Sequence, residues 1–214
     1  MPAVFGSAER AGRHSWNDDP GERSTDADGL VLPYAFNLAL DPETANEIER
    51  IYARLAALQV PDRDLITQYG PCVTLLVVAD GVSAEIVTKV LAWKLPALGA
   101  LPVTFTEPCI IPGAPPALSL RASPTDGLLA LHDAIYTELP EAEVHLHYRP
   151  AYWQPHLKLA NVPGDQAVAA GLIAALAAEW RPLSGRLDRL EVMHYPPVQP
   201  IWQAPLRDGL RDVE

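Results

Sequence analysis

Hydrophobic and polar residues alternate in short patterns that divide the chain into strands and amphipathic helices. The first strand is predicted at 34–40, where apolar residues alternate with small or polar ones: Tyr34, Phe36, Leu38 and Leu40. Asp41 and Pro42 follow as an N-cap and a first-turn residue. Apolar residues then recur at helical spacing: Ile48, Ile51, Tyr52, Leu55 and Leu58. An amphipathic helix is therefore expected from Pro42 to Pro61.

The middle of the chain predicts a central strand, a second helix and a hairpin. The run 72–78 is short, apolar and β-branched, which is typical of a buried strand. Ser83 is expected to cap a helix that ends at Pro96. Two extended runs, 103–111 and 117–122, flank a Pro/Gly turn and predict a β-hairpin.

The second half repeats the first in outline. A third helix is expected to begin near Thr125, and the strand 153–161 follows. Asp165 is expected to cap an Ala-rich helix, after which 187–195 returns as a strand. The order βαβα-ββ-αβαβ predicts an α+β fold with internal duplication.

Two predicted strands carry polar pairs in matching positions. The two segments share the form Pro, polar, apolar, polar, Leu: Pro71-Cys72-Val73-Thr74-Leu75 and Pro155-His156-Leu157-Lys158-Leu159. In a strand, residues i and i+2 share a face, so Cys72 projects with Thr74. His156 projects with Lys158 for the same reason. If a pseudo-twofold axis relates the halves, both pairs face one cleft and surround one phosphate.

In these motifs, and in element order from about Leu30 to Leu206, the chain resembles the two-histidine (2H) phosphoesterase superfamily. That superfamily includes the bacterial RNA 2′,3′-cyclic phosphodiesterases known as 2′-5′ RNA ligases. The resemblance implies a bilobal domain with two antiparallel sheets, helices on their outer faces and a central cleft. It also implies two His-x-Thr/Ser motifs, with one His as general base, the other as general acid, and the hydroxyls on the phosphate. Neither a metal nor an organic cofactor is implied.

The chain departs from the family pattern at two of the four motif positions. Cys72 stands where the first His is expected, and Lys158 stands where the second Thr is expected. His156 and Thr74 match. A thiol with an ordinary pKa near 8.5 is poorly suited to replace an imidazole with a pKa near 6.5. Loss of one acid–base group slows the family reaction by about 10²–10⁴-fold.

Three hypotheses follow for the altered site. In the first, the protein is a slow or re-purposed phosphoesterase in which His156 works with water or another residue and Lys158 binds the phosphate. In the second, it is a nonhydrolytic binder of a nucleotide or cyclic phosphate. In the third, Cys72 is a nucleophile activated by His156, with its pKa lowered by Lys158. In each, the side chains of Cys72 and His156 are expected within about 10 Å, on a cleft that holds one phosphate.

Residues that flank the motifs complete the candidate substrate site. With Thr74 and Lys158, the candidates to bind phosphate or stack a base are Tyr69, Arg149, Tyr152 and Trp153, although flanking aromatics are as often packing residues. Tyr195 follows the last strand and is expected to reach the cleft. The pair His145 and His147 lacks a third ligand of suitable spacing, so no metal site is predicted. His132 is expected to be solvated.

Charge and composition restrict the partners. The 214 residues carry a formal net charge of −11, which opposes binding of long nucleic acid but allows a local phosphate pocket. The expected partner is therefore a small phosphodiester, a nucleotide or an RNA end. No apolar run of about 18 residues and no leader pattern is present, and two cysteines are too few for a disulfide framework. We expect a cytoplasmic protein with no membrane partner, composed of a flexible tail (1–29) and one domain (30–214).

Overall fold

The computed structural model describes seven parts of the chain: residues 34–57, 70–79, 82, 99–112, 116–162, 166–195 and 198–206. The predicted tail, the helix predicted after Ser83 and the candidate Tyr69 lie outside these residues.

The described elements follow the predicted α+β order. In chain order they are: β1 (Tyr34–Leu40), α1 (Pro42–Ala57), β2 (Cys72–Val78), β3 (Leu101–Ile111), β4 (Ala117–Ala122), α4 (Asp126–Tyr136), η2 (Glu141–Glu143), η3 (Leu146–Tyr148), β5 (His156–Asn161), α5 (Gln166–Ala177), β6 (Leu183–His194) and β7 (Gln199–Pro205). The fold class predicted from the sequence is confirmed. β6 begins earlier than predicted, and β7 and the two 3₁₀ turns were not predicted.

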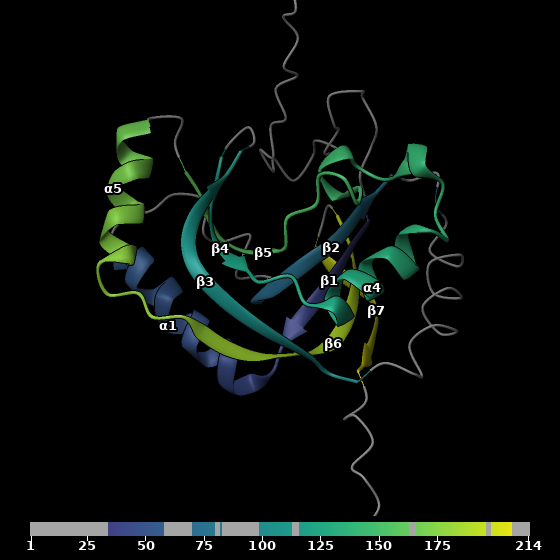
Figure 1. The fold of residues 1–214 in the computed structure, drawn as a ribbon, viewed down its shortest axis with the longest axis horizontal. Coiled ribbons are helices and arrows are strands. Elements are labelled where there is room, and N and C mark those ends of the chain that lie inside the picture. Colours follow the sequence, from purple (N-terminus) through teal and green to yellow (C-terminus); the bar gives the residue numbers. More distant parts are fainter. Residues whose placement is uncertain are drawn as a thin grey trace, which may run out of the picture.

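The seven strands pair into one sheet instead of the two separate sheets predicted. Their order is β1-β2-β5-β4-β3-β6-β7, and β1 also pairs with β6, so the first six of these strands close a ring. The ring is visible in Figure 1 as a strongly curved sheet, with β3 and β6 sweeping around β1 and β2. The two motif strands, β2 and β5, meet where the register contains the single pair Val73 and Leu157, whereas β1 and β6 also join the two halves along the length of β1. This narrow junction and the longer β1–β6 pairing together join what the duplication predicted as two sheets.

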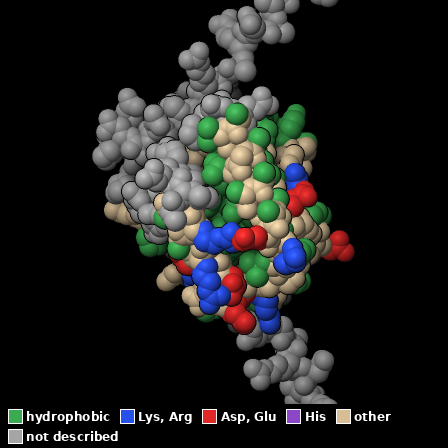
Figure 2. Space-filling model, turned by 90° about the vertical axis from the view of Figure 1, so that its left-hand side faces the viewer, with side chains coloured by type: hydrophobic (Ala, Val, Ile, Leu, Met, Phe, Trp, Pro, Cys, Tyr) green, Lys and Arg blue, Asp and Glu red, His purple; other side chains and the backbone are tan. Residues whose placement is uncertain are grey.

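The helices cover the outer surface of the ring. α5 packs on β3, α1 on β6 and α4 on β2. Figure 1 shows α1 and α5 together on one side and α4 on the other. Figure 2 faces the side of α1 and α5, where charged side chains gather below a mainly hydrophobic area.

Asp41 fixes the start of α1 against β6. Its Oδ1 accepts hydrogen bonds from the backbone N–H groups of Glu43 and Thr44, at 3.1 and 3.0 Å. Its Oδ2 accepts from the backbone N–H of Arg186 at 2.7 Å. Gly185 lies beside this cap, and a Cβ there would come within 1.9 Å of the Thr44 hydroxyl. The predicted N-cap therefore also anchors the helix to the sheet.

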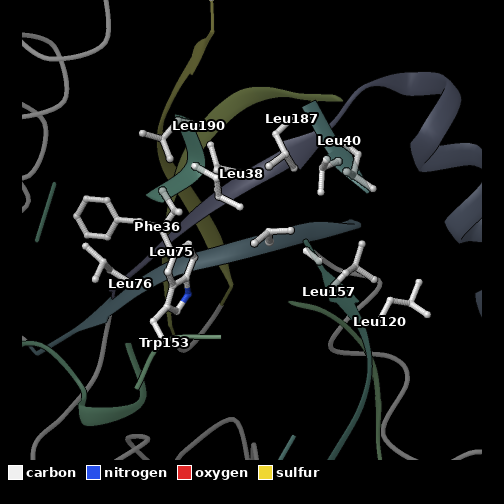
Figure 3. Packing of buried hydrophobic residues seen from close by; sticks show 14 of the residues in the cluster. Phe36, Leu38, Leu40, Leu75, Leu76, Leu120, Trp153, Leu157, Leu187 and Leu190 are labelled. Atoms are coloured by element: carbon white, nitrogen blue, oxygen red, sulfur yellow. The ribbon is translucent and has the colours of Figure 1, made fainter. Parts of the chain in front are cut away.

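The core lies on the sheet face that the helices cover. The alternate residues Phe36, Leu38 and Leu40 of β1 are buried in it, as the strand pattern predicted. Figure 3 shows these side chains packed with Leu75, Leu187 and others from neighbouring strands. Val73 and Leu157, the pair at the β2–β5 junction, are fully buried in the same cluster. Side chains at odd positions of β1 therefore project to the opposite face of the sheet.

Candidate functional site

The sheet register places the two polar pairs on one face. Val73 and Leu157 are paired across β2 and β5 and point into the core. Continuing this antiparallel register by one residue sets Thr74 opposite His156 and Cys72 opposite Lys158. Because directly opposed residues project to the same side, these four side chains share the face away from the core.

Backbone contacts hold both motif strands in place. Gly70, whose φ is +69°, occupies the left-handed region immediately before β2, where a side chain would be strained. The indole N–H of Trp153 donates to the backbone carbonyl of Thr74 at 3.1 Å. The Tyr52 hydroxyl, from α1, donates to the carbonyl of Lys158 at 3.2 Å.

A line of polar residues, which we call the polar row, crosses the sheet through the candidate site. Its members are cross-strand partners in consecutive pairs, apart from Thr74 and His156, which follow from the continued register: Glu107, Arg121, His156, Thr74, Asn37, Glu191 and Gln203. A second, parallel line of residues lies two residues further along β4 and β5, where Lys158 is opposite Ser119. Sequence patterns identified His156 and Thr74 but missed their partners on β1, β4 and β6.

His156 is held in one tautomer. Its Nδ1 is 2.7 Å from the backbone carbonyl of Gln154, which can only accept, so Nδ1 carries the proton and Nε2 keeps its lone pair. Burial lowers the pKa of His156, and the charges of Lys158 and Arg121 lower it further. The imidazole is therefore neutral at pH 7 and able to accept a proton at Nε2.

Cys72 is a buried thiol. Its residue is 7% exposed, and burial raises the pKa of the Cys72 thiol to about 12, with Glu191 contributing in the same direction. The third hypothesis required Lys158 to lower this pKa, and that expectation is wrong, because desolvation and the Glu191 carboxylate raise it. At neutral pH the thiol is protonated, so it supplies neither a thiolate nucleophile nor a general base.

Thr74 faces a buried amide. Its hydroxyl donates to Oδ1 of Asn37 at 2.9 Å, which uses the only proton of that hydroxyl. Asn37 is fully buried, and its Nδ2 has no partner among the described residues. Nothing in the sequence marks Asn37, because it lies on a strand whose visible signal is the alternation of large apolar residues on the other face.

Each end of the polar row carries an arginine–carboxylate pair. At one end Arg121 Nε donates to Glu107 Oε1 at 3.1 Å, and both side chains are largely exposed. Near the other end Arg189 Nε donates to Glu191 Oε1 at 2.7 Å. Glu191 is only 8% exposed and lies opposite Asn37. The second pair is therefore the more desolvated, and its geometry is the more restricted.

The flanking candidates from the sequence have different environments. The Trp153 ring stacks on His132 with centroids 4.0 Å apart, and the residue is buried, so this face of the indole packs inside the protein. Arg149 donates to the Val144 carbonyl and pairs with Glu141 at 3.2 Å, which fixes the turn after α4. Tyr152 is 58% exposed and remains a candidate surface for a base.

The remaining histidines and Tyr195 also have defined surroundings. His132 was expected to be solvated, and this is wrong: it is buried, and its Nε2 lies 2.8 Å from the Tyr148 carbonyl. The sequence pattern of α4 could not reveal that the Trp153 ring covers His132. His147 is near enough to lower the pKa of His156. Tyr195 and Tyr148 each pack against a small apolar cluster of the site face, formed by Ala35 of β1, Val77 of β2 and Ala79 just after β2.

The described residues offer neither a metal-binding cluster nor a membrane span. Within these parts of the chain, no set of three or more His, Cys, Asp or Glu residues could hold a metal ion. None of the helices described there has the length and apolar character needed to cross a membrane.

Sequence comparison assigns the family. A profile of the 2′-5′ RNA ligase superfamily matches residues 40–198, which include both motif strands. The chain belongs to this superfamily. Comparison with curated proteins gives no match. The resemblance inferred from the two motifs is therefore confirmed at the level of the family.

Solved structures with the same fold support the assignment. The structure of TT0787 of Thermus thermophilus has a TM-score of 0.56 and 13% identity, covering 83% of this chain and 100% of that one. A phosphoesterase structure has a TM-score of 0.54 and 16% identity, with 83% and 99% coverage. E. coli LigT complexed with 3′-AMP has a TM-score of 0.51 and 16% identity, with 82% and 97% coverage. At these identities the likeness concerns the fold.

Proposed function

We propose that this protein is a slow phosphoesterase for a small phosphodiester, a nucleoside 2′,3′-cyclic phosphate or an RNA end, with His156 as its proton-transferring group. The observation that carries the proposal is the state of His156. Its Nδ1 is fixed on the Gln154 carbonyl and its pKa is lowered, which leaves Nε2 ready to accept a proton. LigT, which has the same fold, has been crystallised with the nucleotide 3′-AMP.

The chemistry divides between His156 and the cations beside it. His156 Nε2 removes a proton from water as the water oxygen bonds to phosphorus and the bond to the leaving sugar oxygen breaks. Lys158 and Arg121, whose charges reach His156, stabilise the charge that develops on the phosphoryl oxygens. Family members use a second imidazole to protonate the leaving oxygen. Here solvent water protonates the leaving oxygen, because Cys72, with a pKa of about 12, is a far weaker acid than an imidazolium ion, and turnover is therefore slow.

The same thiol favours one alternative, a nonhydrolytic binder of a nucleotide or cyclic phosphate. Such a protein would keep the phosphate contacts of Lys158 and Arg121 and lose chemistry together with the first His. The two functions differ in what His156 does: in an enzyme its removal stops turnover, whereas in a binder its removal costs one hydrogen bond.

Turnover and binding of adenosine 2′,3′-cyclic phosphate test the proposal. His156→Ala should reduce product formation by about 10²–10⁴-fold. Its dissociation constant, measured by calorimetry, should change by about fivefold, the effect of one hydrogen bond worth about 1 kcal/mol. His194→Ala, on β6 and outside the polar row, is the matched control and should behave as the parent. Binding without product formation would establish that the protein is a nonhydrolytic binder. Absence of both binding and product formation would refute both functions.

A further inference from the structure

The two ends of the polar row differ in hydrogen-bonding character. Towards the β4 and β5 end, Arg121, which also pairs with Glu107, and Lys158 of the adjacent parallel line supply positive charge and N–H donors, which suit phosphate. The end on β1 and β6 presents Asn37 and Glu191, an amide and a carboxylate. Thr74 lies between the two ends. A ligand that follows the row from the phosphate end therefore meets a different chemistry beyond Thr74.

Thr74 can only accept a hydrogen bond from a ligand. Its single proton goes to Asn37 Oδ1 at 2.9 Å, and its oxygen retains lone pairs. An ionised phosphate group offers no proton to these lone pairs. In this arrangement the hydroxyl is suited to a ligand O–H or N–H and not to the phosphoryl oxygens that the family resemblance assigned to it.

Asn37 and Glu191 supply a donor and an acceptor next to Thr74. Asn37 is fully buried, and its Nδ2 has no partner among the residues the structure describes. Buried donors are almost always hydrogen-bonded, so this amide needs an acceptor. Glu191, opposite Asn37, is a carboxylate with several lone pairs, of which Arg189 uses one. A ligand hydroxyl can accept from the Asn37 amide and donate its one proton to either Glu191 or Thr74, so it matches a set of this composition.

We infer that Asn37, Thr74 and Glu191 form a hydroxyl-binding subsite beside the phosphate site. This inference rests on the proposed function, because it takes His156 and Lys158 as the phosphate end. The ligand is then a ribose phosphate ester that keeps a free hydroxyl on the carbon next to the phosphorylated one. A linear 2′- or 3′-ester has such a hydroxyl, whereas a 2′,3′-cyclic phosphate has both oxygens esterified. The subsite therefore favours linear esters and ring-opened products.

Calorimetry with adenosine 3′-monophosphate and its 2′-deoxy analogue tests the inference, because the two probes differ in one hydroxyl. The parent protein should bind the ribose probe about tenfold more tightly, as expected for hydrogen bonds that include a charged acceptor. Thr74→Val and Glu191→Gln should each bring the ratio of the two dissociation constants toward one. Thr74→Ser keeps the acceptor oxygen and should keep the ratio.

Matched variants separate the subsite from general damage. Thr104→Val makes the same change on β3, where the Thr104 hydroxyl contacts Ser184, and should keep the parent ratio. Glu107→Gln alters the carboxylate at the opposite end of the row and should also keep it. Lys158→Thr should weaken both probes equally, because it removes a phosphate contact that the two share. Thermal unfolding of each variant identifies any that fail to fold.

The possible results distinguish the hydroxyl subsite from the phosphate site. Equal affinity of the parent for both probes overturns the hydroxyl subsite and leaves the phosphate site intact. A ratio that survives both Thr74→Val and Glu191→Gln also overturns it, because the discrimination then arises elsewhere. If neither probe binds and no cyclic phosphate binds, the proposed function fails and the subsite fails with it.

Discussion

β2 and β5 carry the same motif in the sequence and opposite chemistry in the structure. On β2, Cys72 is a buried neutral thiol and the Thr74 hydroxyl donates its hydrogen bond to Asn37 Oδ1. On β5, His156 and Lys158 are only partly buried, and His156 is held as a neutral base. Two strands in matching positions therefore differ in chemical character, with a neutral imidazole and a charged side chain on β5 and a neutral thiol and a hydrogen-bond acceptor on β2.

The surroundings of position 72 on β2 determine which side chain can work there. An imidazolium ion at position 72 would be stabilised by the nearby Glu191 carboxylate. The thiol there is desolvated and lies near the Glu191 carboxylate, which together raise its pKa to about 12. The environment of β2 therefore keeps the thiol neutral, and the acidic residue on β6 would destabilise a thiolate further.

The largest expected effect concerns the reactivity of the thiol. With a pKa near 12 instead of about 8.5, the thiolate fraction of Cys72 at pH 8 falls by about a thousandfold, so alkylation of the folded protein by iodoacetamide should slow at least to that extent. Mass spectrometry of the labelled peptides measures the rate, with the same peptide in urea as the reference. Rapid labelling of Cys72 in the folded protein would restore the thiol hypothesis.

Cys72→His should restore the missing acid–base group. Cyclic phosphodiesterase activity should then rise by roughly one to three orders of magnitude. The steady-state rate of product formation measures this, and Cys109→His on β3 is a matched control at the other buried cysteine. A folded Cys72→His protein without any gain would mean that β2 has diverged beyond the one position, which favours the binder.

Lys158→Thr should weaken affinity for a cyclic nucleotide by about ten- to a hundredfold, because a charged hydrogen bond worth roughly 1.5–3 kcal/mol is lost. The remaining affinity should depend less on salt. The change recreates the family's own motif, so turnover at saturating substrate should persist. Calorimetry at two salt concentrations checks the affinity, and unchanged binding would remove Lys158 from the phosphate site.

The smallest expected effect is a shift in pH dependence. As a general base, His156 works when neutral, so activity should fall as the pH drops through its lowered pKa, below 6.5. Lys158 is one of the charges that lower this pKa. In Lys158→Thr the acidic limb of the kcat profile should therefore move to higher pH. A limb that stays in place would mean that a group other than His156 controls the profile.

The polar pairs on β2 and β5 could be predicted from the sequence because a period of two assigns faces within one strand. Val73 and Leu157 had to point inward, which placed their neighbours on the opposite face. The same reasoning could not reveal Asn37 or Glu191. Each lies between large apolar residues, and only the pairing of β1 with both β2 and β6 brings it to Thr74.

The surroundings of individual side chains could not be predicted from the sequence either. Trp153 and Arg149 lie close to the second motif in sequence. The Trp153 ring nevertheless stacks on His132, and Arg149 makes two hydrogen bonds to the turn after α4, so both residues serve packing and loop structure. The single sheet was also not predictable, because the duplication indicates two similar halves and not the one residue pair through which β2 and β5 join.

The junction at Val73 and Leu157 also determines where the ring of strands opens. β1 pairs with β6 along its whole length, whereas β2 and β5 share one register pair. Local opening begins where the fewest backbone hydrogen bonds must break, so the backbone amides near this junction should exchange with deuterium before those of β1. Thr74 and His156 stand on either side of the junction. A ligand that contacts both Thr74 and His156 bridges β2 and β5, so its binding should slow amide exchange at the junction.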